Sequence, residues 1–328
     1  MSRILLAGHG NVGKAFHELL IEEKPRLETI LGEAPRVVGV LRRSGAWLDE
    51  NGVGVGGTLL SKRQSMSVVE ALDKVRPDVF VELTTSNLQT GEPGASYIRA
   101  ALERGIPVVT ANKGPLLRHY EGLTRLAREK GVAFRFEGTV AGSIPTLNLH
   151  EFTLVGNPVL RFDGILNGTS NYILTRMAEE GLAFADALKE AQELGYAEAD
   201  PTADVGGHDA AAKLVILANH VLGLRLTFDD VQREGIERIS AASIRLAAKE
   251  GYAIRLIATA DARTRQASVQ PRLVPVDSPL NVRGSLNVVR FTTAHAGAFT
   301  ISGKGAGGRE TATAVLSDVI HVLRASRP

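Results

Sequence analysis

Acidic side chains and a lysine are concentrated in one stretch of the sequence, 194–213, where they could carry out proton transfer. Asp209 and Lys213 are four positions apart, so on a helix they share one face. Lys213 is the one charged residue of the segment 210–218, and a helix that is apolar on nearly every face is buried. A buried lysine needs a partner, which Asp209 supplies, and burial makes its pKa adjustable, as acid–base catalysis requires. The alternative is a surface ion pair contributing about 0.3–0.5 kcal/mol.

A glycine motif near the start of the chain predicts a dinucleotide site. Gly8, Gly10 and Gly13 follow the apolar run 4–7 and open a helical pattern. In this Gly-x-Gly-x-x-Gly context the helix N-terminus, here with Asn11 and Val12, faces a pyrophosphate with free N–H groups and a positive dipole end. The alternative is a glycine-rich turn that binds nothing.

Two arginines indicate which dinucleotide is preferred. The second predicted strand, 37–41, ends in Arg42 and Arg43, where NAD-specific sites usually have a carboxylate for the ribose 2′-hydroxyl. An arginine there accommodates a 2′-phosphate, so NADP(H) is predicted over NAD(H). The alternative is a solvated surface pair.

A second lysine, Lys113, follows the apolar run 108–110, which has the pattern of a parallel strand. Ligands of open α/β sheets bind beyond the carboxyl ends of their strands. We therefore expect Lys113 to point toward the nicotinamide, although an ordinary position at the start of a helix is equally compatible with the pattern.

The elements that position these residues change character near residue 140. Up to about 135, short apolar runs alternate with amphipathic stretches, which predicts an α/β fold with a Rossmann-type doubly wound parallel sheet. From about 143, helices are grouped and then followed by strands, which predicts an α+β substrate domain. The expected strands are 4–7, 37–41, 79–83, 108–110, 132–136, 159–166, 252–260, 268–276, 285–293 and 298–302. The expected helices are 12–23, 67–75, 94–104, 115–130, 143–153, 170–180, 184–194, 206–223, 240–250 and 307–323.

The predicted domains are therefore 1–136 for the dinucleotide, 137–302 for the substrate, and a C-terminal helix, 303–328, that returns to the first domain. A length of 328 residues suits two such units. The glycine-rich stretch 51–57 predicts a mobile loop.

Composition excludes several classes of function. The 38 basic and 36 acidic residues are spread along the chain, so no nucleic-acid partner is expected. Apolar stretches such as 214–218 are far shorter than the roughly 18 residues of a membrane span, and the start of the chain runs directly into a strand. No membrane, no signal peptide and a cytoplasmic location are therefore expected. The absence of cysteine excludes thiolate metal sites and covalent thiol catalysis.

Two common dehydrogenase chemistries are also excluded. None of the five tyrosines is followed by a lysine four positions later, which short-chain dehydrogenases require, and no histidine cluster has zinc-ligand spacing. Acid–base work must therefore fall to lysines and carboxylates.

Taken together, these motifs resemble homoserine dehydrogenase. The resemblance covers nearly the whole chain and is carried by the segments 8–13, 84–87, 110–115, 137–142, 164–173, 195–213 and 303–318. It implies interconversion of L-homoserine and L-aspartate 4-semialdehyde with a nicotinamide cofactor, in the biosynthesis of threonine and methionine. Many relatives carry an acid where Arg42 and Arg43 stand, and this departure strengthens the prediction of NADP(H).

The resemblance also implies roles for individual residues. Glu198 holds the substrate ammonium, and Gly168, Thr169 and Tyr196 line the substrate pocket. Lys213 exchanges the proton on the substrate oxygen. Asp204 and Asp209 orient that lysine and the substrate. Lys113 lies close to substrate and nicotinamide, and the division of acid–base duty between the two lysines stays open.

Further contacts follow from the same resemblance. Thr85, Ser86 and Gly305 match positions that contact the cofactor. Backbone carbonyls of Glu137, Val140, Gly142 and Ile144 match those that bind a monovalent cation in some members. A homodimer through the sheet of the second domain is expected. The chain ends after its last helix, so the short form of the family, without a C-terminal regulatory module, is expected.

Two alternatives to this function remain. One is another NADP-dependent amino-acid or hydroxy-acid dehydrogenase of similar build. The other is a non-catalytic NADP sensor.

Overall fold

The computed structural model describes residues 2–54 and 63–325. The chain forms two compact units, one made of Met1–Thr139 with Gly307–Pro328 and the other of Val140–Ala306. The domain boundaries expected from the sequence, 136 and 302, lie close to these.

Unit 1 contains a seven-stranded sheet in the order β4-β3-β2-β1-β5-β6-β7. Strands β2, β1, β5, β6 and β7 are parallel, and β3 and β4 extend the β2 edge as antiparallel strands. The Rossmann-type α/β prediction is confirmed. The strands are β1 (Arg3–Ala7), β2 (Arg36–Arg42), β3 (Gly45–Leu48), β4 (Arg63–Gln64), β5 (Val79–Glu82), β6 (Val108–Thr110) and β7 (Phe134–Arg135).

Both faces of this sheet are buried, because alternate residues of β1 enter different cores. Ile4 and Leu6 pack in one core with residues of α1 and α12, whereas Leu5 and Ala7 pack in the other with residues of α3 and α4. The helices of unit 1 are α1 (Asn11–Glu22), α2 (Lys24–Leu31), α3 (Val68–Val75), α4 (Gly94–Glu103), α5 (Lys113–Lys130) and α12 (Gly308–Ala325).

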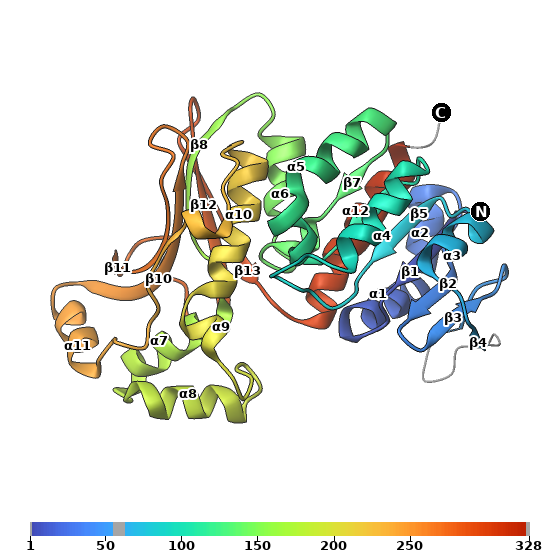
Figure 1. Ribbon diagram of the computed structural model, residues 1–328. Coiled ribbons are helices and arrows are strands. Elements are labelled where there is room, and N and C mark those ends of the chain that lie inside the picture. The colour runs from blue at the N-terminus through green and yellow to red at the C-terminus, as the bar shows by residue number, and fades with distance from the viewer. Residues whose placement is uncertain (1, 55–62, 326–328) are drawn as a thin grey trace. The chain divides into compact units, whose positions relative to one another are not determined.

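The last helix, α12, packs beside the first, α1, although they stand at opposite ends of the chain (Figure 1). A buried ion pair fixes α12: Nε of Arg135 lies 3.0 Å from Oδ1 of Asp318, and the backbone N–H of Glu137 donates to Oδ2 of the same carboxylate at 2.8 Å. The last helix is therefore anchored to β7 and to the residues that follow it.

Unit 2 contains a six-stranded sheet in the order β13-β12-β8-β10-β11-β9, antiparallel except for β9 beside β11. Its strands are β8 (Val159–Ile165), β9 (Gln232–Arg233), β10 (Tyr252–Asp261), β11 (Ala267–Pro275), β12 (Leu286–Thr293) and β13 (Ala298–Lys304). Its helical segments are α6 (Thr146–Asn148), η2 (Leu149–Thr153), α7 (Gly168–Glu180), α8 (Phe184–Glu193), α9 (Thr202–Val205), α10 (His208–Val221), η3 (Phe228–Asp230) and α11 (Ala241–Lys249). Every residue of α10 from Ala210 to Asn219 is buried, as its sequence predicts.

Several short elements, among them α9, η3 and β9, were not expected from the sequence, and three further parts differ from the prediction. Helix α2 and the edge strands β3 and β4 were not expected, and the helix expected over 143–153 is a short α6 followed by the π-helical turn η2. Pro25 stands in the first turn of α2, where its missing N–H costs nothing. Of the loop expected over 51–57, residues 55–57 lie outside the described residues.

Candidate active site

The predicted pair on α10 of unit 2 is formed. Nζ of Lys213 lies 2.7 Å from Oδ2 of Asp209, and the two side chains are 9% and 16% exposed. Nζ also donates to the carbonyl of Leu166 at 2.8 Å, directly after β8. Because an ammonium group has three N–H donors and the described residues provide these two acceptors, one donor remains for a ligand.

Asn167 links this pair to a second carboxylate. Its Nδ2 donates to Oδ1 of Asp204 at 2.6 Å and to Oδ2 of Asp209 at 3.0 Å. Its Oδ1 accepts the backbone N–H of Ser170, so the same side chain is the N-cap of α7. The sequence reasoning did not single out Asn167, although its position before the helix pattern of α7 is a cap signal.

The other residues predicted for the substrate lie on the segments next to this group. Oγ1 of Thr169 donates to the carbonyl of Tyr196 at 2.7 Å, and the ring of Tyr196 stacks on Tyr172 with centroids 4.5 Å apart. Gly168 packs against the carbonyl of Ser285, which an added Cβ would approach to 2.6 Å. The side chain of Glu198 is exposed.

The charges of this group are unbalanced. Lys213 brings one positive charge, whereas Asp204, Asp209 and Glu198 bring three negative charges. The excess of carboxylate suits a ligand with a cationic group, and the buried ammonium suits proton exchange with a ligand oxygen.

In unit 1, the glycine motif has the geometry of a pyrophosphate loop. Gly8 has a φ of 90°, and an added Cβ would lie 2.3 Å from the carbonyl oxygen of Leu83, so a side chain is excluded there. An added Cβ on Gly10 would meet nothing within 4 Å, and its φ is −81°. Neither the protein's packing nor its backbone therefore requires glycine at position 10. Close approach of a ligand explains it.

The N-terminus of α1 is prepared for an anion in the same way. Its N-cap, Gly10, supplies no side-chain hydrogen bond, and the first turn holds no acidic residue. The N–H groups of the first turn, which begins with Asn11 and Val12, are therefore free of side-chain caps. A nicotinamide dinucleotide fits this loop.

A cavity of about 420 Å³ lies at the carboxyl ends of β1, β2 and β5. It is lined by the glycine loop, by both predicted arginines and by Thr85. β1 lies between β2 and β5, so the crossover to β2 runs to one side of β1 and the later connection to β5 runs to the other, which opens a crevice at this edge. The residues that line the cavity are Ala7, Gly8, His9, Gly10, Leu41, Arg42, Arg43, Val68, Leu83, Thr84, Thr85, Pro93 and Tyr97.

A buried carboxylate, which the sequence reasoning missed, organises the ends of β5 and β6. Glu82 is fully buried and accepts hydrogen bonds from the N–H and hydroxyl of Thr84, from Oγ1 of Thr110 and from Nδ2 of Asn112. Burial raises the pKa of Glu82, and these donors oppose that rise.

Lys113 is attached to this network. Its backbone N–H donates to Oγ of Ser86 at 3.2 Å, and Ser86 in turn donates to Oδ1 of Asn112. As the first residue of α5, Lys113 puts a positive charge at the positive end of a helix dipole, which opposes folding slightly. A cation in that place suggests a functional reason for it.

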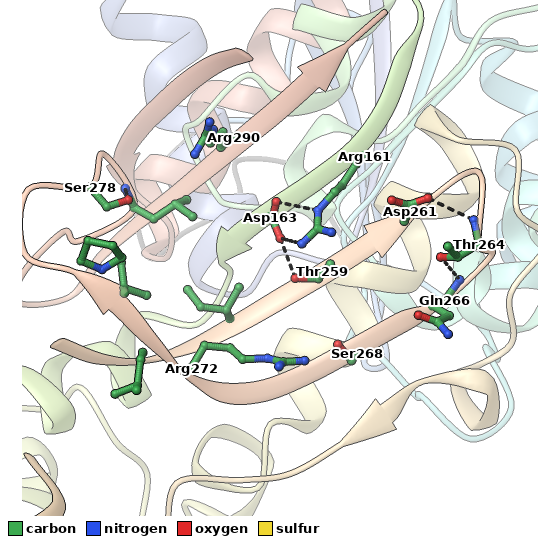
Figure 2. A pocket seen from close by; sticks show the side chains of 15 residues that line it. Arg161, Asp163, Thr259, Asp261, Thr264, Gln266, Ser268, Arg272, Ser278 and Arg290 are labelled. Carbon is green, nitrogen blue, oxygen red and sulfur yellow. Dashed lines mark hydrogen bonds and ion pairs between the residues drawn. The ribbon is translucent and has the colours of Figure 1, made fainter. Parts of the chain in front are cut away.

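A second cavity, of about 620 Å³, lies on the sheet of unit 2 (Figure 2). Asp163 accepts hydrogen bonds from Arg161 and Thr259 there, and Arg290 of β12 and Arg272 of β11 lie on other strands of the same sheet. The strand neighbours of Asp163 and Arg290, such as Phe162 and Phe291, are buried. This cavity contains none of the predicted site residues.

The residues expected to bind a cation are at a tight turn. Ala141 and Gly142 both have left-handed backbone, with φ of 56° and 57°. Gly142 packs against Gly305, and Gly305 against the buried side chain of Asn287. Among the described residues, no cluster of three or more histidine, aspartate or glutamate side chains could hold a metal ion.

A Rossmann-type unit with a pyrophosphate loop, and a second unit that buries a paired lysine, define an NAD(P)-dependent oxidoreductase. The chain belongs to the homoserine dehydrogenase family. Residues 8–137 match the family model of the homoserine dehydrogenase NAD binding domain, and residues 145–320 match the homoserine dehydrogenase model.

Individual relatives agree over nearly their whole length. A homoserine dehydrogenase of Methanocaldococcus jannaschii is 44% identical, covering 99% of both chains. An NAD(+)-dependent homoserine dehydrogenase of Pseudomonas canavaninivorans is 42% identical over 98% of this chain and 96% of that one. A hyperthermophilic archaeal homoserine dehydrogenase solved with NADPH has a TM-score of 0.84 at 29% identity and covers 100% of this chain and 98% of that one.

Within residues 2–54 and 63–325, no helix is long and apolar enough to span a membrane.

Proposed function

We propose that the protein interconverts L-homoserine and L-aspartate 4-semialdehyde with NADP(H), a step toward threonine and methionine. The observation that carries the proposal is the buried Lys213, bonded to Asp209 at 2.7 Å, in a chain whose two halves both match the family. The bound nicotinamide supplies or accepts the hydride. The remaining work falls to the side chains.

In the reductive direction, Lys213 donates a proton from its third N–H to the aldehyde oxygen while the carbonyl carbon receives the hydride. Asp209 and the carbonyl of Leu166 hold the other two N–H groups, so the ammonium is oriented before the substrate binds. The product is the primary alcohol of homoserine. In the reverse direction, the same nitrogen accepts the hydroxyl proton.

The carboxylates bind the cationic end of the substrate. Glu198 accepts hydrogen bonds from the substrate ammonium group. Asp204, which is hydrogen-bonded to Asn167, orients the substrate beside Lys213. Gly168, Thr169 and Tyr196 line the same pocket. The excess of carboxylates favours an amino acid over a simple hydroxy acid, because a hydroxy acid has no ammonium group to balance their negative charge.

The glycine loop residues Gly8, Gly10, Asn11, Val12 and Gly13 hold the pyrophosphate. Thr85, Ser86 and Gly305 contact the cofactor, and Lys113 lies close to both the substrate and the nicotinamide. Arg42 and Arg43, in the cavity at the end of β2, bind the 2′-phosphate and favour NADP(H) over NAD(H).

Steady-state assays test the substrate. Purified protein with NADP⁺ should oxidise L-homoserine at alkaline pH and should not oxidise malate or aspartate. Turnover of malate without homoserine would assign another dehydrogenase, and tight NADPH binding with no turnover would assign a sensor. For the cofactor, Arg42→Ala with Arg43→Ala should lower NADP(H) affinity, and unchanged affinity would refute the arginine assignment.

A second copy of the chain is the proposed occupant of the open face of the sheet in unit 2. Two observations favour it: the cavity of about 620 Å³ on that face, and Leu273, which lines the cavity and is 59% exposed. Light scattering should give a dimer for the wild type and a monomer for Leu273→Glu. Leu246→Glu, at a 64% exposed leucine of α11, is the matched control and should stay dimeric.

The carbonyls of Glu137, Val140, Gly142 and Ile144 are the proposed ligands of a monovalent cation. The strained backbone at Ala141, with a φ of 56° in a non-glycine residue, supports a functional turn there. Turnover should be higher in sodium or potassium chloride than in tetramethylammonium chloride of equal ionic strength. Equal rates in the three salts would exclude the cation.

We also propose that the protein is cytoplasmic and binds neither nucleic acid nor a membrane. The near balance of 38 basic and 36 acidic residues supports it.

A further inference from the structure

The side chain of Arg42 is held on two sides. Its Nη2 donates to Nδ1 of His9 at 2.5 Å, and its guanidinium carbon lies 5.5 Å from the centre of the Trp47 ring. The sheet register causes the first contact: Ala7 of β1 pairs with Leu41 of β2, so the residues just after this pair are neighbours. His9 is therefore next to Arg42 although 33 positions separate them.

The hydrogen bonds behind Arg42 have a fixed direction. Arginine only donates, so Nδ1 of His9 must be the ring nitrogen without hydrogen, and Nε2 carries the proton. That Nε2 lies 3.3 Å from Nδ1 of His17, which must then accept. A hydrogen bond with the backbone of Val53 opposes the lowering of the His17 pKa that burial causes.

Both imidazole rings are neutral at physiological pH, as this chain of hydrogen bonds requires. His9 is 8% exposed and His17 is 3% exposed. Burial, followed by the charge of Arg42, lowers the pKa of His9 to about 4, and burial lowers the pKa of His17 to about 4. The lone pair on His9 Nδ1 is therefore available to Arg42.

We propose that His9 is the residue that positions Arg42 for the 2′-phosphate, so that a side chain inside the glycine motif sets the preference for NADP(H). This inference rests on the proposed binding of the 2′-phosphate by Arg42. Among the described residues, no side chain or carbonyl accepts the Nε and Nη1 hydrogens of Arg42, so two donors of its planar fork are available for a phosphate. Arg43, the neighbouring cation, has no such support from His9.

An exposed arginine has many rotamers, and most are lost when it binds an anion. His9 and Trp47 restrict them before binding, so less freedom is lost. Because NAD(H) has no 2′-phosphate, it gains nothing from this restriction. Removing His9 should therefore weaken NADPH binding selectively.

The test compares dissociation constants for NADPH and NADH, measured by fluorescence titration, in four variants. His9→Ala should raise the NADPH constant about 10-fold and leave the NADH constant within about 2-fold. His9→Asn, which keeps an acceptor oxygen near the place of Nδ1, should recover most of the NADPH affinity. In Arg42→Ala, adding His9→Ala should change the NADPH to NADH ratio no further.

Distinct outcomes refute distinct claims. If Arg42→Ala leaves the ratio unchanged, the proposed phosphate contact itself is wrong. If Arg42→Ala lowers NADPH affinity but His9→Ala does not, or if His9→Ala weakens both dinucleotides equally, His9 has only a structural role. Should His9→Ala fail to fold, His9→Phe fills the same space without an acceptor and decides between the same outcomes.

Discussion

Replacing Lys213 by methionine separates the charge of this side chain from its packing, because the unbranched apolar stem is kept. The variant leaves Asp209 with Asn167, at 3.0 Å, and without its ammonium partner at 2.7 Å. Breaking a buried pair by removing one partner costs about 3–5 kcal/mol. Since the side chain of Asp209 is still 16% exposed, we expect the low end of that range, about 3 kcal/mol, in the free energy of unfolding.

Catalysis should suffer more than stability. A positioned acid or base contributes about 10²–10⁴-fold, so turnover of homoserine by Lys213→Met should fall by about that factor. Affinity for NADPH should be unchanged, because Lys213 is not among the residues proposed to hold the dinucleotide. Urea denaturation, steady-state kinetics and fluorescence titration measure the three quantities.

The matched control is Lys189→Met on α8. Lys189 also pairs with a carboxylate four positions away, Glu193, but at 3.9 Å and with side chains 77% and 66% exposed. Exposed pairs contribute about 0–1 kcal/mol, so stability and turnover should both stay near the wild-type values. If Lys213→Met behaves like this control, the reasoning from a buried ion pair is refuted. If it unfolds easily but keeps turnover within 10-fold, the acid–base role is refuted.

Three further predictions concern other buried polar groups. Asn167→Ala should cost about 1–2 kcal/mol in urea unfolding through loss of the α7 cap and should raise the KM for homoserine; an unchanged KM would separate Asn167 from the site. Glu82→Gln should lower the free energy of unfolding by about 1–3 kcal/mol in the same assay. The amide NH2 accepts no hydrogen bonds, so the glutamine cannot satisfy all four donors; equal stability would mean that the carboxyl is protonated. The folded-state pKa of His17, about 4, lies below the unfolded value of 6.5, so the unfolded state binds more protons and stability falls as pH drops from about 6.5 to about 4. His17→Phe should reduce that fall in urea midpoints across this range, and a parallel pH curve would contradict the assigned neutral ring.

Local patterns predicted most of the fold. Strong periodicity placed β1, β2, β10 and the buried helix α10 within one or two residues of their observed bounds. The edge strands β3 and β4 were not predicted, because they are short and only Ala46 of β3 is fully buried, which leaves little hydrophobic pattern. Helix α2 was missed because only Leu27 and Leu31 of its eight residues are buried, which leaves a weak apolar pattern.

The site could be predicted only where the relevant spacing is local. Asp209 and Lys213 are one helical turn apart, so their contact followed from the helix itself. The carbonyl of Leu166 is 47 positions from Lys213, and His9 is 33 positions from Arg42. These contacts depend on strand register and chain crossovers, which no short window of sequence contains.

The two units share one arrangement, which explains why an asparagine is the N-cap of α5 in unit 1 and of α7 in unit 2. Asn112 accepts the N–H of Gly114 to cap α5 and donates to the buried Glu82; Asn167 accepts the N–H of Ser170 to cap α7 and donates to Asp204 and Asp209. Serine or aspartate could cap a helix, but aspartate has no donor for a carboxylate and serine has only one. An amide supplies an acceptor and two donors from one short, rigid side chain. Each asparagine thus ties the position of a helix to the position of a carboxylate, so the backbone that forms the fold also orients the charges.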